Sequence, residues 1–238
     1  YLHERIAIWK RARMLAYAYY PTRSDARNAL IGLRGVVSQN QRIRHFSRSV
    51  RVEERNFQLL SYPGRPSPAW DLFIKNELHR VRPIPGHTEG LMVLLMAMTR
   101  KCPLSCAHCF EGDVLNKKDE ISATDVITMI RKFQVHGTAQ VELAGGEPMN
   151  RFEDLLHILR STDQRASDFW VLTSGWNLSA DRARQMKEAG LTGVAVSVDH
   201  WNEEAHDFFR GRNGSFAQAK QAVHHAREAG LVVALSLV

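Results

Sequence analysis

The chain has 238 residues, 44% of them hydrophobic, so it can bury a sizeable core in one large domain or two small ones. Its net charge of +7 is uneven. Residues 1–88 hold 16 Lys and Arg against 6 Asp and Glu, a net charge of +10, whereas residues 89–238 hold 16 against 19, a net charge of −3. Three cysteines exclude a disulfide framework and favour a reducing cytoplasm.

We expect neither a signal peptide at the N-terminus nor a membrane span. Lys10, Arg11 and Arg13 interrupt what would be the apolar core of a signal peptide. The longest clean apolar run, residues 91–98, is far below the roughly 20 residues that cross a bilayer. Because the chain starts without a methionine and stops inside an apolar run, we expect it to be a fragment of a longer protein.

Residues 4–20 have the pattern of a basic amphipathic helix that ends at Pro21. Its apolar stripe consists of Ile8, Trp9, Ala12, Leu15, Ala16 and Tyr19. We expect this stripe to pack on the domain behind it; the alternative is a helix on a membrane surface.

The rest of the N-terminal region is rich in arginine and proline. The closely spaced arginines are Arg42, Arg44, Arg48, Arg51 and Arg55. They indicate either a solvated helical face or a phosphate-binding surface. A loop at residues 63–68, a short helix over residues 70–80 and a Pro- and Gly-containing linker at residues 83–86 follow. We therefore expect a basic, mainly helical region over residues 1–88.

From residue 89 onward, strands alternate with helices. Strands are expected at residues 91–98, 139–144, 169–172 and 194–198, with a fifth from residue 231. Four helices are expected between them, capped at Ser122, Asn150, Ser179 and Ser215. This alternation predicts right-handed βαβ units and a parallel sheet. The fold class is therefore α/β, and a partial (β/α) barrel cut after its fifth strand fits better than a doubly wound sheet.

The three cysteines form one motif, Cys102-x3-Cys106-x2-Cys109, directly after the first expected strand. Thiolates select zinc, copper(I) and iron–sulfur clusters. Three thiolates without a fourth cysteine fit a cluster with one iron left open, whereas a zinc site would need a histidine such as His87 or His108.

Further polar motifs stand where the next three strands end, the edge at which (β/α) barrels place their chemistry. Gly145-Gly146-Glu147-Pro148 follows the second strand, Thr173-Ser174-Gly175 the third, and Ser197-Val198-Asp199 the fourth. Asp199 could instead be an ordinary helix cap.

Together, these motifs resemble those of the radical S-adenosylmethionine (radical SAM) enzymes. Thr173-Ser174-Gly175 is similar to the family's Thr-Asn-Gly, with Ser174 in place of Asn, and Ser197-Val198-Asp199 is similar to its Ser-Leu-Asp. Phe209-Arg210-Gly211 and Ser215-Phe216 resemble the branch with molybdenum-cofactor, heme-related and peptide-maturing members. The resemblance covers about residues 89–238.

The resemblance implies two cofactors, a [4Fe–4S] cluster and SAM, and a site for each. Cys102, Cys106 and Cys109 would be the cluster ligands. The SAM-binding residues would be His108, Phe110, Gly145, Gly146, Glu147, Pro148, Thr173, Ser174, Ser197 and Asp199. Within that set, the glycine-rich turn would contact the SAM amino group, with Glu147 as its charge partner. His108 and Phe110 would lie near the adenine.

The resemblance also implies the activity. A reduced cluster would cleave SAM to a 5′-deoxyadenosyl radical, which would abstract hydrogen from a substrate, most simply a peptide or natural-product precursor. Such an oxidoreductase or transferase would be cytoplasmic and would need a flavodoxin- or ferredoxin-like electron donor. The alternative is a non-catalytic iron–sulfur or zinc protein whose basic arm binds a protein or nucleic acid.

Overall fold

The computed structural model describes residues 2–43, 49–58, 60, 62–88, 90–119 and 121–237. By its internal contacts the chain divides into two compact units. The N-terminal unit comprises residues 1–92 with 133–139 and 165–167, and the barrel unit comprises residues 93–132, 140–164 and 168–238. The domain boundary expected after residue 88 stays a prediction. Within the described residues, no helix combines the length and the apolar character that a membrane span requires.

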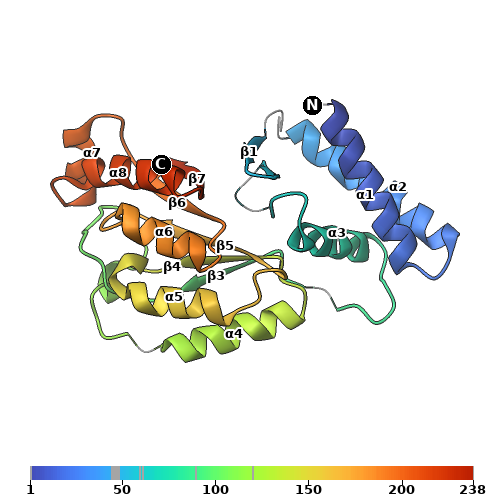
Figure 1. The fold of residues 1–238 in the computed structure, drawn as a ribbon, viewed down its shortest axis with the longest axis horizontal. Helices are drawn as coiled ribbons and strands as arrows, with labels where there is room; N and C mark the ends of the chain where they lie inside the picture. Colours follow the sequence, from blue (N-terminus) through green and yellow to red (C-terminus); the bar gives the residue numbers. More distant parts are fainter. Residues whose placement is uncertain are drawn as a thin grey trace. The chain divides into compact units, whose positions relative to one another are not determined.

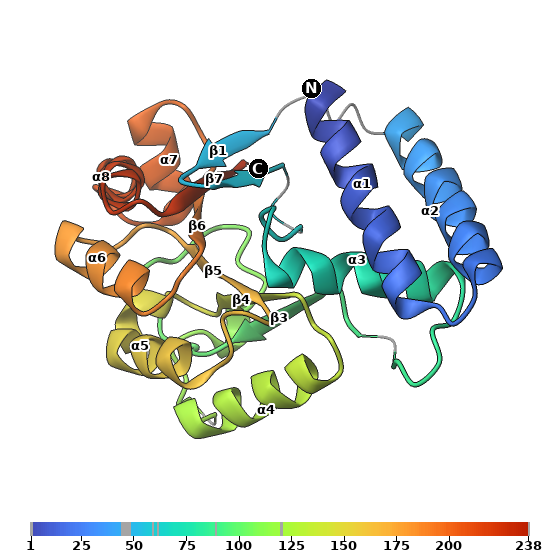
Figure 2. The ribbon, with the colours of Figure 1, turned by 45° about the vertical axis from the view of Figure 1, so that its right-hand side comes forward.

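Three helices build the core of the N-terminal unit: α1 (Leu2–Tyr19), α2 (Arg23–Ile43) and α3 (Pro68–Val81) (Figure 2). The predicted stripe of α1 lies inside this core. Its buried members pack with apolar residues of the other two helices, among them Ala26, Ala29, Leu33, Phe73, Ile74 and Leu78. The stripe is therefore a packing surface within the protein, as expected, and α1 is not a helix that offers it to a membrane.

A two-stranded hairpin, which the sequence did not predict, follows α2. β1 (Val50–Val52) pairs antiparallel with β2 (Arg55–Phe57). Consequently, Arg51 and Arg55 belong to strands, and the arginines of residues 42–55 do not share one helical face. Arg44 and Arg48 lie outside the described residues. The hairpin was missed because its charged residues conceal the short apolar alternation.

The barrel unit contains a five-stranded parallel sheet in the order β3-β4-β5-β6-β7 (Figure 1). The strands are β3 (Val93–Ala97), β4 (Gln140–Ala144), β5 (Asp168–Thr173), β6 (Gly193–Val198) and β7 (Val232–Leu237). The helices that follow the first four strands are α4 (Ala123–Val135), α5 (Phe152–Ser161), α6 (Ala180–Glu188), α7 (Glu203–Arg210) and α8 (Ser215–Glu228). In Figure 2, α4, α5, α6 and α8 form an arc along the outer side of the strands. The predicted α/β partial barrel is thus confirmed.

Strand register separates the two faces of the sheet. Val141 and Leu143 are fully buried on one face. Glu142 lies on the other, in register with Leu95 and Trp170 on the neighbouring strands, because side chains alternate along a strand.

Two predicted helix starts are confirmed, both capped by a serine directly before the helix. Ser122 and Asp125 form the expected reciprocal capping box, and Ser179 caps α6. Two caps were wrong. A 3-10 turn, Pro148–Arg151, precedes α5. Asn150 lies in this turn, and its side-chain Nδ2 donates to Lys101 O instead of capping the helix.

The start of α8 is capped from the preceding helix, not by Ser215. Asp207 of α7 accepts hydrogen bonds from the Gly214 and Phe216 amides and from Ser215 Oγ. Helix α7 was not among the four helices expected from the sequence. Asn202 caps it and two glutamates fill its first turn, which is the signal that could have identified it.

Candidate cofactor site

The cysteine loop, residues 99–110, leaves the end of β3 and is fixed at its start by hydrogen bonds from further along the chain. Asp119 accepts from Thr99 Oγ1 at 2.8 Å and from the Arg100 amide at 2.6 Å. Asn116 accepts from the Cys102 amide at 2.9 Å. Asp119 and Asn116 thus position the first cysteine, and no motif in the sequence had singled them out.

The three thiols are free and partly buried. Burial raises the pKa of Cys102 to about 11, with a further increase from the negative charge of Glu147. Burial likewise raises the pKa of Cys106, although the Arg210 guanidinium opposes that shift. Because the thiolate is the ligand form, a metal bound here must displace protons, and metal binding will depend on pH.

Among the residues described, no three His, Cys, Asp or Glu side chains, the three cysteines included, lie close enough to hold one metal ion. His87 and His108, the candidate zinc ligands, each contact another residue. His87 belongs to the N-terminal unit, where its Nε2 lies 2.8 Å from Asn76 Oδ1. His108 stacks on Phe209 with ring centroids 4.9 Å apart, while Phe110 is 83% exposed.

The turn at Gly145 and Gly146 packs directly against the backbone of the cysteine loop. The Gly146 and Glu147 amides donate to Thr99 O and Lys101 O at 2.7 and 2.8 Å. A Cβ on Gly145 would stand 2.3 Å from Thr99 O, and one on Gly146 would stand 2.5 Å from Lys101 O. Both glycines are therefore required by the close approach of protein backbone. Of the two, Gly145 also has a positive φ of +137°, a backbone conformation that favours glycine.

Glu147 points into the protein and is fully buried. Its Oε1 accepts from Thr173 Oγ1 at 2.7 Å and from the Met149 amide at 3.2 Å. Its Oε2 accepts from the amide, at 2.8 Å, and the hydroxyl of Ser174. Burial raises its pKa, and these hydrogen bonds act in the opposite direction. This carboxylate therefore ties the turn to the end of β5, and Pro148 begins the 3-10 turn beside it.

This arrangement also occupies the polar groups after β5. Thr173 is 3% exposed, and its hydroxyl accepts from the Gly175 amide while donating to Glu147. Ser174 Oγ accepts from the Trp176 amide while donating to Glu147. Both side chains thus have partners within the protein that the sequence motif did not reveal.

At the end of β6, Ser197 is half-buried and the side chain of Asp199 is 2% exposed. Asp199 forms an ion pair with Arg210 Nε through its Oδ2. Neither carboxylate oxygen has a hydrogen-bond partner among the described residues, so the contact of Oδ2 with Arg210 is an ion pair, while His108 Nε2 lies 4.0 Å from Oδ1. Asp199 is therefore not a helix cap. It is a buried carboxylate with one oxygen left to accept from a ligand, beside the cysteine loop.

The end of α7 supports the other side of the cysteine loop. The Ser105 and Ala107 amides donate to the carbonyls of Arg210 and Phe209 at 3.1 and 2.9 Å. Gly211 ends the helix at φ +63°, and a Cβ there would stand 2.8 Å from Ser105 O. The Phe209-Arg210-Gly211 motif thus lies against the cysteine loop, although it was not among the predicted site residues.

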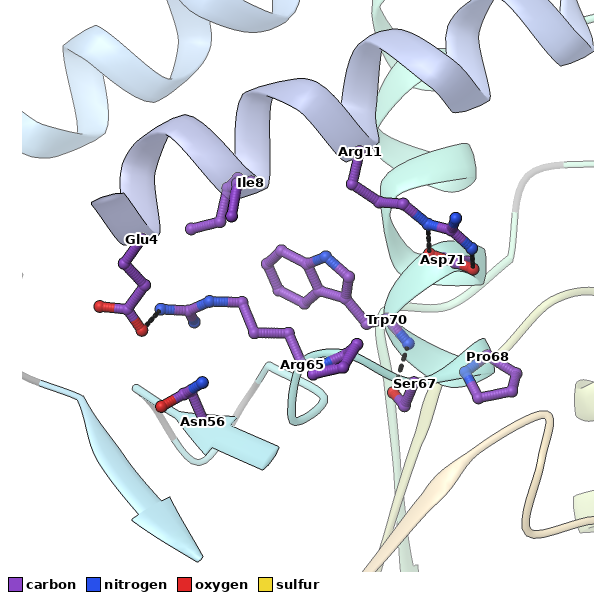
Figure 3. Close-up of a pocket in the computed structure, with 11 residues that line it drawn as sticks. Glu4, Ile8, Arg11, Asn56, Arg65, Ser67, Pro68, Trp70 and Asp71 are labelled. Atoms are coloured by element: carbon purple, nitrogen blue, oxygen red, sulfur yellow. Dashed lines mark hydrogen bonds and ion pairs between the residues drawn. The ribbon is translucent and has the colours of Figure 1, made fainter. Parts of the chain in front are cut away.

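A separate pocket of about 550 Å³ lies in the N-terminal unit (Figure 3). Ile8, Trp70 and prolines line it, and an ion pair stands at each end, Glu4 with Arg65 and Arg11 with Asp71. Ser67 caps α3 beside it. No motif in the sequence indicates this pocket.

Comparison with known proteins identifies the barrel unit. The model of the Radical SAM superfamily matches residues 96–238. The chain is 31% identical over 144 residues to the Fe-coproporphyrin III synthase of Methanosarcina barkeri, covering 60% of this chain and 36% of that protein. It is 26% identical over 144 residues to the sporulation killing factor maturation protein SkfB of Bacillus subtilis, covering 60% and 34%. The chain thus spans little more than a third of the length of these relatives.

A solved structure agrees at the level of the fold. The Streptococcus suis SuiB structure bound to S-adenosylmethionine superimposes with a TM-score of 0.52 at 18% identity, covering 68% of this chain and 38% of SuiB. The family model matches more than half of the chain, including the loop that carries the three cysteines. The chain belongs to the radical SAM superfamily, whose members bind a [4Fe–4S] cluster and S-adenosylmethionine.

Proposed function

We propose that the chain is the catalytic portion of a radical SAM enzyme that cleaves SAM reductively and abstracts hydrogen from a peptide or natural-product precursor. The observation that carries the proposal is the cysteine loop, held by hydrogen bonds on both sides with its three thiols free. When bound, the cluster and SAM supply the electron transfer and the 5′-deoxyadenosyl radical. The protein supplies their position and shielding.

The donor set supports both cofactors. Cys102, Cys106 and Cys109 are the only thiols, so they would hold three irons of a cubane cluster and leave the fourth for SAM. The buried Asp199 Oδ1 lacks a partner among the described residues. It is suited to accept a hydrogen bond from a SAM hydroxyl or amino group, with Ser197 as a second contact from the same strand end.

The structure changes the roles that we propose for the remaining predicted residues. The carboxylate of Glu147 and the hydroxyls of Thr173 and Ser174 bond to each other. We propose that this group positions the Gly145–Gly146 turn, whose free backbone atoms would face SAM, rather than contacting SAM through side chains. His108 and Phe110 remain the candidates for adenine contacts.

The proposed substrate class rests on the charge of the N-terminal region and on a pocket in it. One of the relatives above is named an Fe-coproporphyrin III synthase and another a sporulation killing factor maturation protein. We favour a peptide because the excess positive charge of residues 1–88 suits an acidic segment. The pocket of Figure 3, apolar with charged ends, is suited to one side chain of such a segment.

The first experiment tests the cofactors. After anaerobic reconstitution we expect about four iron and four sulfide per chain, and 5′-deoxyadenosine on addition of SAM and dithionite. Cys106→Ala should lose most of the iron, because no fourth cysteine can replace the ligand. A complete cluster without SAM cleavage would support the alternative, a non-catalytic iron–sulfur protein; about one zinc would support the zinc-binding alternative.

A second experiment tests the basic region. Arg27 and Arg34 are exposed on α2, seven residues apart and therefore on one helix face. Changing both to Glu should weaken binding of a labelled oligoglutamate peptide several-fold, most strongly at low salt. SAM cleavage should stay within twofold of wild type, and Arg160→Glu, at an exposed position on α5 of the barrel unit, is the control. Equal loss of cleavage in a folded variant would contradict this division of roles. Tighter binding of a labelled oligonucleotide than of the peptide would favour a nucleic-acid partner.

The same proposal places the enzyme in the cytoplasm with a flavodoxin- or ferredoxin-like electron donor. The free cysteine thiols and the oxygen sensitivity of an exposed cluster iron support a reducing compartment.

A further inference from the structure

The end of α7 brings a buried positive charge to one cysteine of the loop. Arg210 is the last residue of α7, and its Nη1 lies 3.7 Å from Cys106 Sγ, within hydrogen-bond range for sulfur. Its side chain is only 8% exposed. Neither the predicted cluster ligands nor the predicted SAM-binding residues include it.

Backbone hydrogen bonds hold this contact in place. The carbonyls of Phe209 and Arg210 accept from Ala107 and Ser105, the residues on either side of Cys106. The last turn of α7 and the middle of the cysteine loop therefore move together. Arg210 is directed at Cys106 by the fold, not by a flexible surface contact.

The guanidinium has a counter-charge on its other side. Asp199, 2% exposed, pairs with Arg210 Nε. A buried ion pair is costly to desolvate and is seldom retained for stability alone. Here it fixes the orientation of the guanidinium, so that one nitrogen faces the carboxylate and another faces the sulfur.

We propose that Arg210 is a positioning residue that raises the reduction potential of the cluster by donating an N–H to Cys106 Sγ, with Asp199 holding it in place. The inference rests on the proposed function, because it requires a cluster on these cysteines. Hydrogen bonds to cluster sulfurs and nearby charge set cluster potentials. A single electron from an external low-potential donor adds one negative charge to the cluster, and a cation in contact with a thiolate stabilises that charge. No bond forms or breaks in this step.

The experiment is a redox titration of the reconstituted chain without SAM, followed by electron paramagnetic resonance of the reduced cluster. Arg210→Gln removes the charge and keeps an N–H donor, whereas Arg210→Lys keeps the charge. We expect Arg210→Gln to lower the ratio of reduced to oxidised cluster about tenfold at a fixed potential, which equals a shift of about −59 mV for one electron. Arg210→Lys should recover most of that shift.

Two further variants separate tuning from general effects. Asp199→Asn removes a negative charge beside Arg210, which by itself shifts the potential in the positive direction, so this variant is also combined with Arg210→Gln. If Asp199 holds Arg210 on Cys106, Arg210→Gln should lower the potential less in the Asp199→Asn background than in wild type. Arg212→Gln is the matched control. Arg212 is an exposed arginine on the same side of the cysteine loop that contacts Pro103 O at 3.5 Å but no sulfur. It should leave the potential nearly unchanged.

Iron and sulfide analysis distinguishes a failure of the proposed function from a failure of the inference about Arg210. A wild-type chain without a cluster would overturn the proposed function. A complete cluster whose potential is the same in wild type, Arg210→Gln and Arg212→Gln would overturn the inference alone. If Arg210→Gln does not retain its cluster, Arg210→Met takes its place, since it removes the charge and keeps much of the side-chain volume. A potential equal in wild type, Arg210→Lys and Arg210→Met would overturn the inference, and a negative shift in Arg210→Met that Arg210→Lys does not show supports it.

Discussion

The cysteine loop has two supports that differ in kind. On one side, the Gly145–Gly146 turn meets the cysteine loop through backbone atoms, with its side chains absent or, in Glu147, buried behind it. On the other side, the end of α7 adds a charged side chain, and Arg210 reaches Cys106 Sγ. The first support fixes where the loop lies. The second also brings charge to a proposed ligand.

This difference indicates how each support tolerates substitution. A backbone-to-backbone contact has no flexible atoms that can yield, so any added side chain must displace the loop. A side-chain contact can be altered without moving the backbone. We therefore expect changes at the glycine turn to affect cluster assembly, and changes at Arg210 to affect the electronic properties of an assembled cluster.

The largest effect should follow from Gly146→Val. Its Cβ would stand 2.5 Å from Lys101 O, one residue before Cys102, so the loop must shift. We expect loss of most of the iron after reconstitution. Gly112→Val is the control, since Gly112 follows the cysteine loop closely and a Cβ there meets nothing within 4 Å. Full iron with loss of SAM binding only would show that the turn serves SAM alone.

An intermediate effect should follow from Gly211→Val on the other support. The added Cβ would approach Ser105 Oγ, which can rotate, and Ser105 O at 2.8 Å, which cannot. Gly211 also has a left-handed backbone conformation, which costs a non-glycine residue about 1 kcal/mol or more. We expect partial loss of iron. Gly214→Val, with φ +79° in open space in the same unit, measures the conformational cost alone; equal iron loss in both variants would remove the loop contact from the explanation.

The smallest effect on the cluster should follow from Glu147→Gln. The substitution puts a side-chain NH2 group in place of an oxygen that now accepts from the backbone N–H of Ser174 or Met149. Two buried donors would then face each other. We expect a loss of about 1–3 kcal/mol in the free energy of unfolding, measured by urea denaturation, with iron content near wild type. Glu188→Gln, an exposed position on α6, should change stability by less than about 0.5 kcal/mol. Unchanged stability of Glu147→Gln would mean that the carboxylate is not the tie between β4 and β5.

The sequence by itself determined the parallel strands, the cysteine motif and the strand ends that carry polar residues. These features are local: alternation of apolar runs, cap residues and the spacing of Cys102, Cys106 and Cys109 are visible within a few residues. Only the tertiary structure decided what each polar group contacts. Glu147 meets Ser174, and Arg210 meets both Asp199 and Cys106, the latter 104 positions away in the chain. The physical reason is that strand register and the end of α7 set these distances, and no local pattern encodes a contact between segments that far apart.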